Sequence, residues 1–253
     1  MISMSEKILV LVEGVEKEML FFDTFNRNYI GLNNDIRLVP FGCNIYSLFQ
    51  EMKGYDFEID LEKAIELSPS ISEKQKAKIK GMRFGTKYLV FDFDFQEKTM
   101  SDEDKIGALR QMLNIFNNDT ENGYLFINYP MFESFQEKIA SGTTYIESKI
   151  NHSEFANYKR SISERNLGVN CKNISFLEFK SYILAALKES NFLFHGNFDK
   201  KLPYEELISE KYGTNVYLRQ IEELQTEDSI YPLNTSVLLP LFYFGYSKYK
   251  GVS

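Results

Sequence analysis

Short apolar runs alternate with helical patterns along the first half of the chain. Four of these runs have the length and composition of strands: residues 7–12, 36–41, 88–94 and 123–128. The apolar residues that lead the third run are typical of a strand buried on both faces of a sheet. The segments between them carry apolar residues at helical spacing, at residues 15–28, 45–53 and 101–116. Strands that alternate with helices form parallel sheets with the helices packed against them. The sequence therefore predicts an α/β fold with a mostly parallel sheet flanked by helices.

The second half of the chain has mainly helical patterns, at residues 153–165, 175–189 and 204–225. We therefore expect residues 1–140 to form the sheet domain and residues 141–253 a mainly helical C-terminal extension packed on it. Near the end, residues 237–246 are strongly apolar. This run is too short to span a bilayer, so we expect it in the core or in the interface of a homodimer.

Composition limits the classes of protein that fit. The chain has 253 residues, a net charge of −7 and a pI near 5.1, so no overall positive field indicates a nucleic-acid partner. Cys43 and Cys171 are isolated and fit neither a disulfide framework nor a zinc site. No signal peptide and no apolar run of about 20 residues is visible, which predicts a soluble, cytoplasmic protein without a membrane partner.

Residues 55–83 have a helical but polar pattern, followed by Lys87. Basic residues gather towards the end of this segment: Lys74, Lys76, Lys78, Lys80 and Arg83. They form either a solvated helix face or an electrostatic contact with a phosphate backbone.

Acidic residues follow two of the predicted strands. Glu13 comes directly after the first strand, and Asp92 and Asp94 stand at the end of the third. Side chains alternate along a strand, so Asp92 and Asp94 share a face while the backbone stays extended. Open α/β sheets bind their ligands at the carboxyl ends of the strands. Glu133 is expected nearby, in the first turn of a helix for which Pro130 suits the first position.

Carboxylates brought together in this way repel one another, and each raises the pKa of its neighbours. A divalent cation relieves the repulsion, and ligands that are all oxygen suit Mg²⁺ or Mn²⁺ better than zinc. Such a cation polarises a phosphoryl oxygen and activates water. Glu133 could add a ligand to the same cation or to a second one.

The order of these residues resembles the Toprim domain. More narrowly, it is similar to the OLD and RloB nucleases of the abortive-infection group, in which Val-Glu-Gly-x-x-Glu and Asn-Pro-x-x-Glu motifs recur. The first motif reads Val-Glu-Gly-Val-Glu-Lys-Glu over residues 12–18, with Val15 and Glu16 where a Thr–acid pair is usual. In the later motif Tyr129 stands between Asn128 and Pro130. The resemblance covers roughly residues 5–140.

This resemblance implies metal-dependent cleavage of phosphodiester bonds in DNA or RNA at Glu13, Asp92 and Asp94, with Glu133 in support. A lysine beyond the acidic motifs stabilises the transition-state charge in the related nucleases. Lys159 is the candidate by order, and Arg160 is the next one. The resemblance also implies a phage-defence effector that acts with an ATPase partner.

Three alternatives remain open from the sequence. An Asp-x-Asp phosphatase would use Asp92 as nucleophile and Asp94 as acid/base, but Phe95-Gln96 follows instead of the expected small residue. A nucleotide-sugar transferase could bind Mn²⁺ with the same pair, but it leaves Glu13 without a role. A non-catalytic binding or sensor module agrees with the acidic net charge and with the incomplete motifs.

Overall fold

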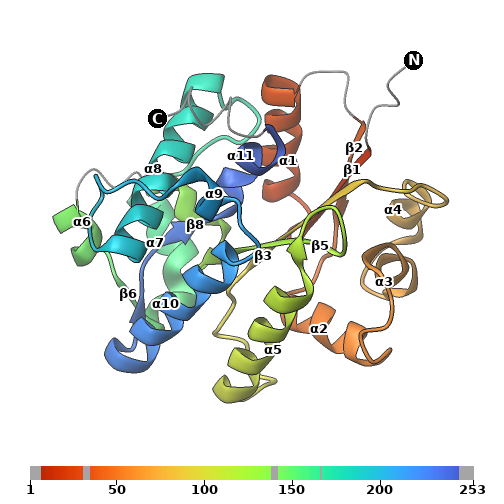
Figure 1. The fold of residues 1–253 in the computed structure, drawn as a ribbon, viewed down its shortest axis with the longest axis horizontal. Helices are drawn as coiled ribbons and strands as arrows, with labels where there is room; N and C mark the ends of the chain where they lie inside the picture. The colour runs from red at the N-terminus through yellow and green to blue at the C-terminus, as the bar shows by residue number, and fades with distance from the viewer. Residues whose placement is uncertain (1–6, 31–34, 138–141, 166, 245–253) are drawn as a thin grey trace.

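A computed structural model describes residues 7–30, 35–137, 142–165 and 167–244. Its centre is a sheet in the order β2-β1-β3-β5-β4 (Figure 1). The strands of this sheet are β1 (Lys7–Val12), β2 (Asp35–Pro40), β3 (Thr86–Asp92), β4 (Asn117–Asn118) and β5 (Gly123–Tyr129). The first four strands of the order are parallel, and β4 is antiparallel to β5. The prediction of a mostly parallel α/β sheet is confirmed.

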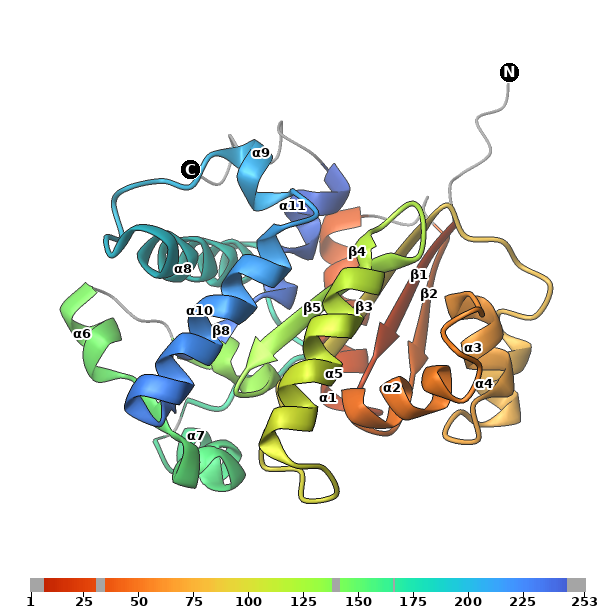
Figure 2. The ribbon, with the colours of Figure 1, turned by 60° about the horizontal axis from the view of Figure 1, so that its bottom comes forward.

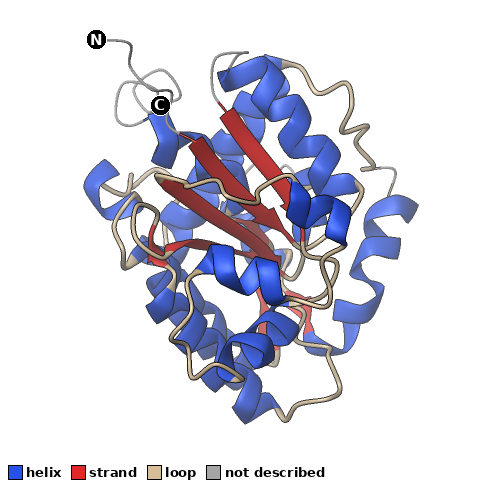
Figure 3. Ribbon diagram, turned by 90° about the vertical axis from the view of Figure 1, so that its right-hand side faces the viewer, coloured by secondary structure: helices blue, strands red, loops and turns tan. Residues whose placement is uncertain are grey.

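Helices cover both faces of the sheet (Figures 2 and 3). Those of the first half are α1 (Lys17–Phe25), α2 (Ile45–Lys53), α3 (Leu61–Leu67), α4 (Glu73–Ala77) and α5 (Asp102–Ile115), with the π-helical turn η1 (Asn26–Ile30) after α1. The chain leaves β1 towards β2 and returns on the other side of β1 to form β3. Right-handed crossovers in opposite directions put their helices on opposite faces, so α1 lies on one face while α2 and α5 pack together on the other.

Polar side chains fix where several helices begin. The Asn44 side chain accepts a hydrogen bond from the Ser47 N–H at 3.0 Å at the start of α2. Ser101 accepts one from the Asp104 N–H at 3.1 Å and opens α5. Acidic residues in the first turn of α5 complement its dipole.

The polar helical pattern of residues 55–83 does not form one helix. It is divided into α3 and α4, and α3 ends at Ser68 because the residue before Pro69 is disfavoured in helical conformation. Lys87 does not belong to an exposed basic face either. It is buried and pairs with Glu62 at 3.0 Å.

The second half is mainly helical, as predicted. Its elements are α6 (Gly142–Glu147), β6 (Ile150–Asn151), η3 (His152–Asn157), α7 (Tyr158–Glu164), α8 (Phe176–His195), α9 (Tyr204–Leu207), α10 (Tyr212–Glu227), β7 (Ser229–Ile230), β8 (Leu233–Asn234), η4 (Ser236–Leu238) and α11 (Leu239–Phe244). The longest, α8, begins at a capping box of Ser175 and Glu178 and ends at Gly196, whose φ of 66° is in the left-handed region. Helix α10 packs against both α5 and α8.

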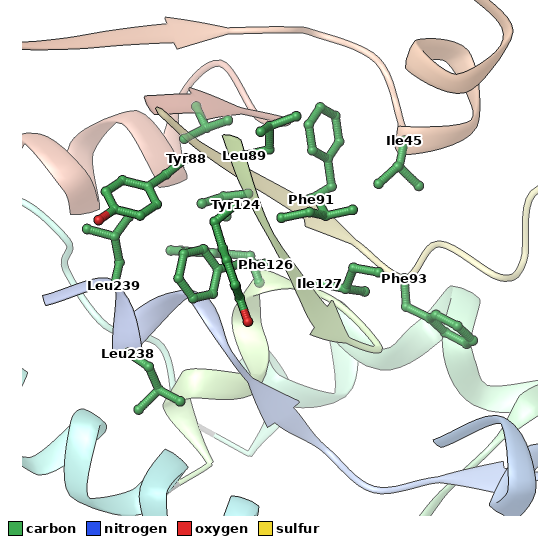
Figure 4. Close-up of a cluster of buried hydrophobic side chains, with 14 of the residues drawn as sticks. Ile45, Tyr88, Leu89, Phe91, Phe93, Tyr124, Phe126, Ile127, Leu238 and Leu239 are labelled. Carbon is green, nitrogen blue, oxygen red and sulfur yellow. The ribbon is translucent and has the colours of Figure 1, made fainter. Parts of the chain in front are cut away.

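The C-terminal segment is built into the core. Strand β8 pairs with β5 antiparallel, and Leu239 lies beside Tyr88 of β3 (Figure 4). Leu238 points away from these side chains and is also buried. One hydrophobic cluster contains residues from both halves of the chain, while the expected boundary at residue 140 lies outside the described ranges. Leu241 is also fully buried. Residues 237–241 therefore lie in this chain's own core, and Phe242 and Tyr243 are half-buried against it. Residues 245 and 246 are outside the described ranges, and a homodimer stays a prediction.

Candidate functional site

Glu13 and Asp92 meet where the strand order reverses. Strand β1 pairs with β2 on one side and β3 on the other, so the carboxyl ends of β1 and β3 flank the switch point at which open α/β sheets bind ligands. Glu13 directly follows β1, and its N–H donates to the Val90 carbonyl at 3.0 Å. The N–H of Asp92, the last residue of β3, donates to Glu13 Oε2 at 3.0 Å. The two acids are thus joined across adjacent strands.

Asn128 orients Asp92 from the next strand. The two residues are paired in the register of β3 and β5, and Asn128 Nδ2 donates to Asp92 Oδ1 at 3.4 Å. The Asn128 side chain is fully buried, and its Oδ1 accepts from the Ser236 N–H at 3.3 Å. The segment after β8 therefore braces the residue that holds Asp92.

Asp94 does not continue the strand, and the expectation that extended alternation places it beside Asp92 is wrong. Strand β3 ends at Asp92, and Asp94 has a φ of 42°, in the left-handed region. Its carboxylate accepts a hydrogen bond from Gln96 Nε2. Its charge still contributes to the raised pKa of Glu13, after the larger effect of burial.

Glu133 lies in the first turn of a helix, as predicted, but that helix is the short 3-10 helix η2 (Phe132–Gln136). Pro130 lies ahead of it, after a cis peptide bond, so its expected place at the first helical position is wrong. Only 5% of the Glu133 side chain is exposed, and its Oε1 lies 3.1 Å from both Lys17 Nζ and Lys159 Nζ. The backbone of η2 is held by Asn234, whose Nδ2 donates to the Phe132 carbonyl at 2.7 Å.

The side chains of the two candidate cations on α7, Lys159 and Arg160, pair with different acids. Lys159 reaches Glu133, whereas Arg160 pairs with Glu164 of its own helix at 3.3 Å. The Lys159 side chain is 68% exposed, so its ammonium is accessible from outside as well. Of the two candidates, Lys159 is therefore the one that contacts the acidic cluster.

Glu18 is a member of the cluster that the sequence did not single out. A Cβ on residue 14 would overlap the Glu18 carboxylate, which means that Gly14 makes room for this side chain beside the loop after Glu13. Glu16, which matched the family motif by position, is exposed at the start of α1. In the sequence, Glu16 and Glu18 flank Lys17 and either could join the cluster. The residue at which α1 begins determines that Glu18, and not Glu16, faces the acidic cluster.

The electrostatics separate Glu133 from the other acids. Burial, together with the charges of Asp94, Glu18 and Glu133, raises the pKa of Glu13 to about 8, although the hydrogen bond from the Asp92 N–H opposes this. Burial and the neighbouring Glu13 raise the pKa of Asp92 well above its ordinary value. Burial also acts to raise the pKa of Glu133, but Lys17 and Lys159 outweigh it and the pKa is lowered. Glu13 and Asp92 are thus the acids of the cluster whose ionised form is disfavoured, whereas the ionised form of Glu133 is stabilised by the two lysines.

Glu13 and Asp92 are the candidate ligands for a metal ion. Among the described residues, no three Asp, Glu, His or Cys side chains stand ready in the arrangement of a metal site. Mg²⁺, however, is commonly held by one or two carboxylates and completes its shell with water and phosphate oxygens. Glu13 and Asp92 are two carboxyl groups close enough for the charge of Glu13 to raise the pKa of Asp92, and both have raised pKa values. The donor set fits a two-carboxylate magnesium or manganese site.

A hollow of about 790 Å³ lies next to the loop that follows Glu13. Val15 and Glu16 line it, together with three basic residues from different segments: Arg37, Lys78 and Lys172. Of the basic residues predicted between 74 and 83, only Lys78 lines this hollow, and Lys76 pairs with Glu73 at 2.9 Å. The basic segment therefore contributes one residue to this concave surface.

Comparison with protein-family models, with curated proteins and with solved structures finds no match to this chain. Membership of the Toprim nucleases therefore stays a prediction from the motif residues. Within the described ranges, none of the helices combines the length and the apolar character needed to cross a membrane.

Proposed function

We propose that this chain is a Toprim-type nuclease that uses Mg²⁺ or Mn²⁺ to hydrolyse phosphodiester bonds in DNA or RNA. One observation carries the proposal: Glu13 and Asp92 come from adjacent parallel strands, meet at the switch point of the sheet, and have raised pKa values there. Carboxylates in this state favour a divalent cation, because a cation restores the charge balance that burial disturbs.

Each residue has a role that follows from its position. Glu13 and Asp92 would hold the cation, and Asn128 fixes the rotation of the Asp92 carboxylate. The bound cation supplies polarisation of a phosphoryl oxygen and activation of water. Lys159 is exposed enough for a phosphate to reach, and its ammonium can stabilise the negative charge that develops on the phosphoryl oxygens. Asp94 and Glu18 add negative charge close by.

The wider setting is proposed from the same resemblance. A phage-defence role with an ATPase partner agrees with a net charge of −7, because a partner could supply positive surface for nucleic acid that this chain has only locally. A homodimer could do the same.

Cleavage assays on labelled single- and double-stranded DNA and RNA test the proposal. We expect cleavage with Mg²⁺ or Mn²⁺, none with EDTA, and a loss of at least about 100-fold in Glu13→Gln and Asp92→Asn, as for removal of a group that stabilises transition-state charge. Glu58→Gln is the matched control, since Glu58 is exposed and remote in the chain from the cluster. Full cleavage by both site variants would overturn the proposal.

A non-catalytic binding or sensor module is the second candidate, and the lack of a ready three-residue ligand set among the described residues favours it. Calorimetry with Mg²⁺ separates the two candidates, because a module that binds no cation at millimolar concentration cannot be a metal nuclease. The phosphatase alternative requires Asp94 as acid/base beside Asp92, and the left-handed turn at Asp94 and its bond to Gln96 disfavour that role. Turnover of an aryl phosphate without cleavage of nucleic acid would support it.

A further inference from the structure

The acidic cluster is divided into two parts with different charge balance. Lys17 and Lys159 place two ammonium groups on a single oxygen of Glu133, each at 3.1 Å. Glu13 and Asp92 instead lie beside further acids, and the hydrogen bonds between them and their neighbours come from an N–H and an amide rather than from a cation. Glu133 is therefore paired with positive charge, whereas no cation from the described part of the chain forms an ion pair with Glu13 or Asp92.

Lys17 is the more firmly placed of the two cations on Glu133. It lies in the first turn of α1, directly before Glu18, and its side chain is 29% exposed, against 68% for Lys159. Helix α1 is anchored by Phe21, whose ring packs edge-on against Phe132 of η2 at 5.2 Å between centroids. The backbone elements that carry Lys17 and Glu133 are therefore packed together, and the ion pair joins them.

A divalent cation bound to Glu133 would lie close to the Lys17 ammonium. Two positive charges a few ångströms apart repel strongly where the surroundings are partly buried. To bind there, the cation would have to displace an ammonium that the fold already provides. Glu13 and Asp92 present no such obstacle.

We propose that the cluster binds one divalent cation, at Glu13 and Asp92, and that the Lys17 ammonium takes the place of a second. Glu133 is then a positioning residue: Lys17 neutralises it, and it holds Lys159 beside the site. This inference rests on the proposed function and deepens it, since it gives the number of cations and separates the residues that hold the cation from those that hold the lysine.

The number of bound Mn²⁺ ions tests the first half, by equilibrium dialysis and by electron paramagnetic resonance on the full chain. We expect one ion per chain in the wild type and in Glu133→Gln, with affinities within about threefold of each other. Asp92→Asn should lose the ion. In Lys17→Met, which removes the ammonium but keeps an unbranched side chain, we expect a second, weaker ion at Glu133.

Two ions in the wild type, or loss of the ion in Glu133→Gln, would overturn the inference and leave the nuclease proposal intact if cleavage persists. No bound ion together with no cleavage would overturn both. A wild type with one ion and a Lys17→Met variant that also binds only one would overturn the role given to Lys17.

A double-mutant cycle tests the positioning role. Glu133→Gln should reduce kcat in the wild-type background and have almost no further effect in Lys159→Met, because the carboxylate acts through that lysine. Equal losses in both backgrounds would overturn the positioning role. Melting temperatures of the four proteins identify any loss that comes from unfolding.

Discussion

The N–H of Asp92 donates to the Glu13 carboxylate at 3.0 Å. The last residue of β3 therefore holds the carboxylate of the residue that follows β1. This bond opposes the rise in the pKa of Glu13, yet burial and the nearby acids prevail, and the pKa reaches about 8. The fold thus places the Glu13 carboxyl group where its ionised form is unfavourable, which lowers the stability of the folded protein when that group is charged. Such a placement is common at functional sites, and its energetic consequences can be measured.

The metal-free protein should lose stability as the pH rises from about 5 to 8. The folded-state pKa of Glu13 is raised from 4.5 to about 8, so in this window the folded protein keeps a proton that the unfolded chain has released. The free energy of unfolding therefore falls with increasing pH. Glu13→Gln should remove much of this slope and raise the melting temperature at pH 8 by ~2–4 °C, the effect of about 1 kcal/mol in a chain of this size. Thermal melts from pH 5 to 8.5 measure it, and Glu58→Gln should leave the slope unchanged.

Binding of Mn²⁺ should release protons and strengthen as the pH rises towards 8. A carboxyl group must be deprotonated to act as a ligand, so the proton on Glu13 competes with the cation below about pH 8. At a concentration about 100 times Kd the cation should stabilise the fold by ~2.7 kcal/mol. Calorimetry in two buffers of different ionisation enthalpy counts the protons released. An affinity that does not change between pH 6 and 8 would contradict the assignment of Glu13 as a ligand.

Gly14→Ala should disturb the site and leave the fold almost intact. The added methyl group would overlap the Glu18 carboxylate, and this flexible side chain can swing away, so the cost to stability should stay below about 1 kcal/mol. Cleavage should fall by about tenfold, which corresponds to ~1.4 kcal/mol of transition-state stabilisation. Glu18→Gln should show a similar loss.

Gly107→Ala is the control for that substitution. Nothing lies within 4 Å of a Cβ at residue 107, which is in the interior of α5, so alanine should stabilise the protein by about 0.5–1 kcal/mol and leave cleavage unchanged. If both glycine variants lose cleavage equally, the contact between Gly14 and Glu18 has no functional meaning.

Reversing two charges in the hollow beside Val15 should weaken binding of nucleic acid. Lys78 and Lys172 line this hollow, and each phosphate contact contributes about 0.9 to the slope of log K against log salt for duplex DNA. Lys78→Glu combined with Lys172→Glu should therefore reduce the slope by ~2. The matched control is Lys200→Glu with Lys201→Glu, which makes the same charge change on the segment between α8 and α9. Fluorescence anisotropy titrations at several salt concentrations give both slopes, and equal slopes would remove this surface from the proposal.

The sequence predicted the regular elements well because their signals are local. Helix α2 occupies residues 45–53, as predicted, since its apolar spacing and the Asn44 cap agree. The strands β1, β3 and β5 follow from apolar runs of strand length, and the meeting of Glu13 with Asp92 follows from strands that end at the same edge of the sheet.

The details that the sequence predicted wrongly or left open depend on the structure around each residue. Whether a strand continues to Asp94 depends on its neighbours, and here the backbone enters the left-handed region instead. Which of Glu16 and Glu18 turns inward depends on the residue at which α1 begins. The apolar C-terminal run could fill a core or an interface, and only the pairing of β8 with β5 decides this for its described part.

The hydrogen bonds of Asn128 can all form only after a distant C-terminal segment has been synthesised. Its side chain reaches Asp92 on one side and the Ser236 N–H on the other, over 108 residues of sequence. A ribosome must release residue 236 before that second partner can reach Asn128. We therefore expect unfinished chains to lack the brace on Asp92, which would delay the proposed nuclease activity until the C-terminal segment has folded onto the sheet.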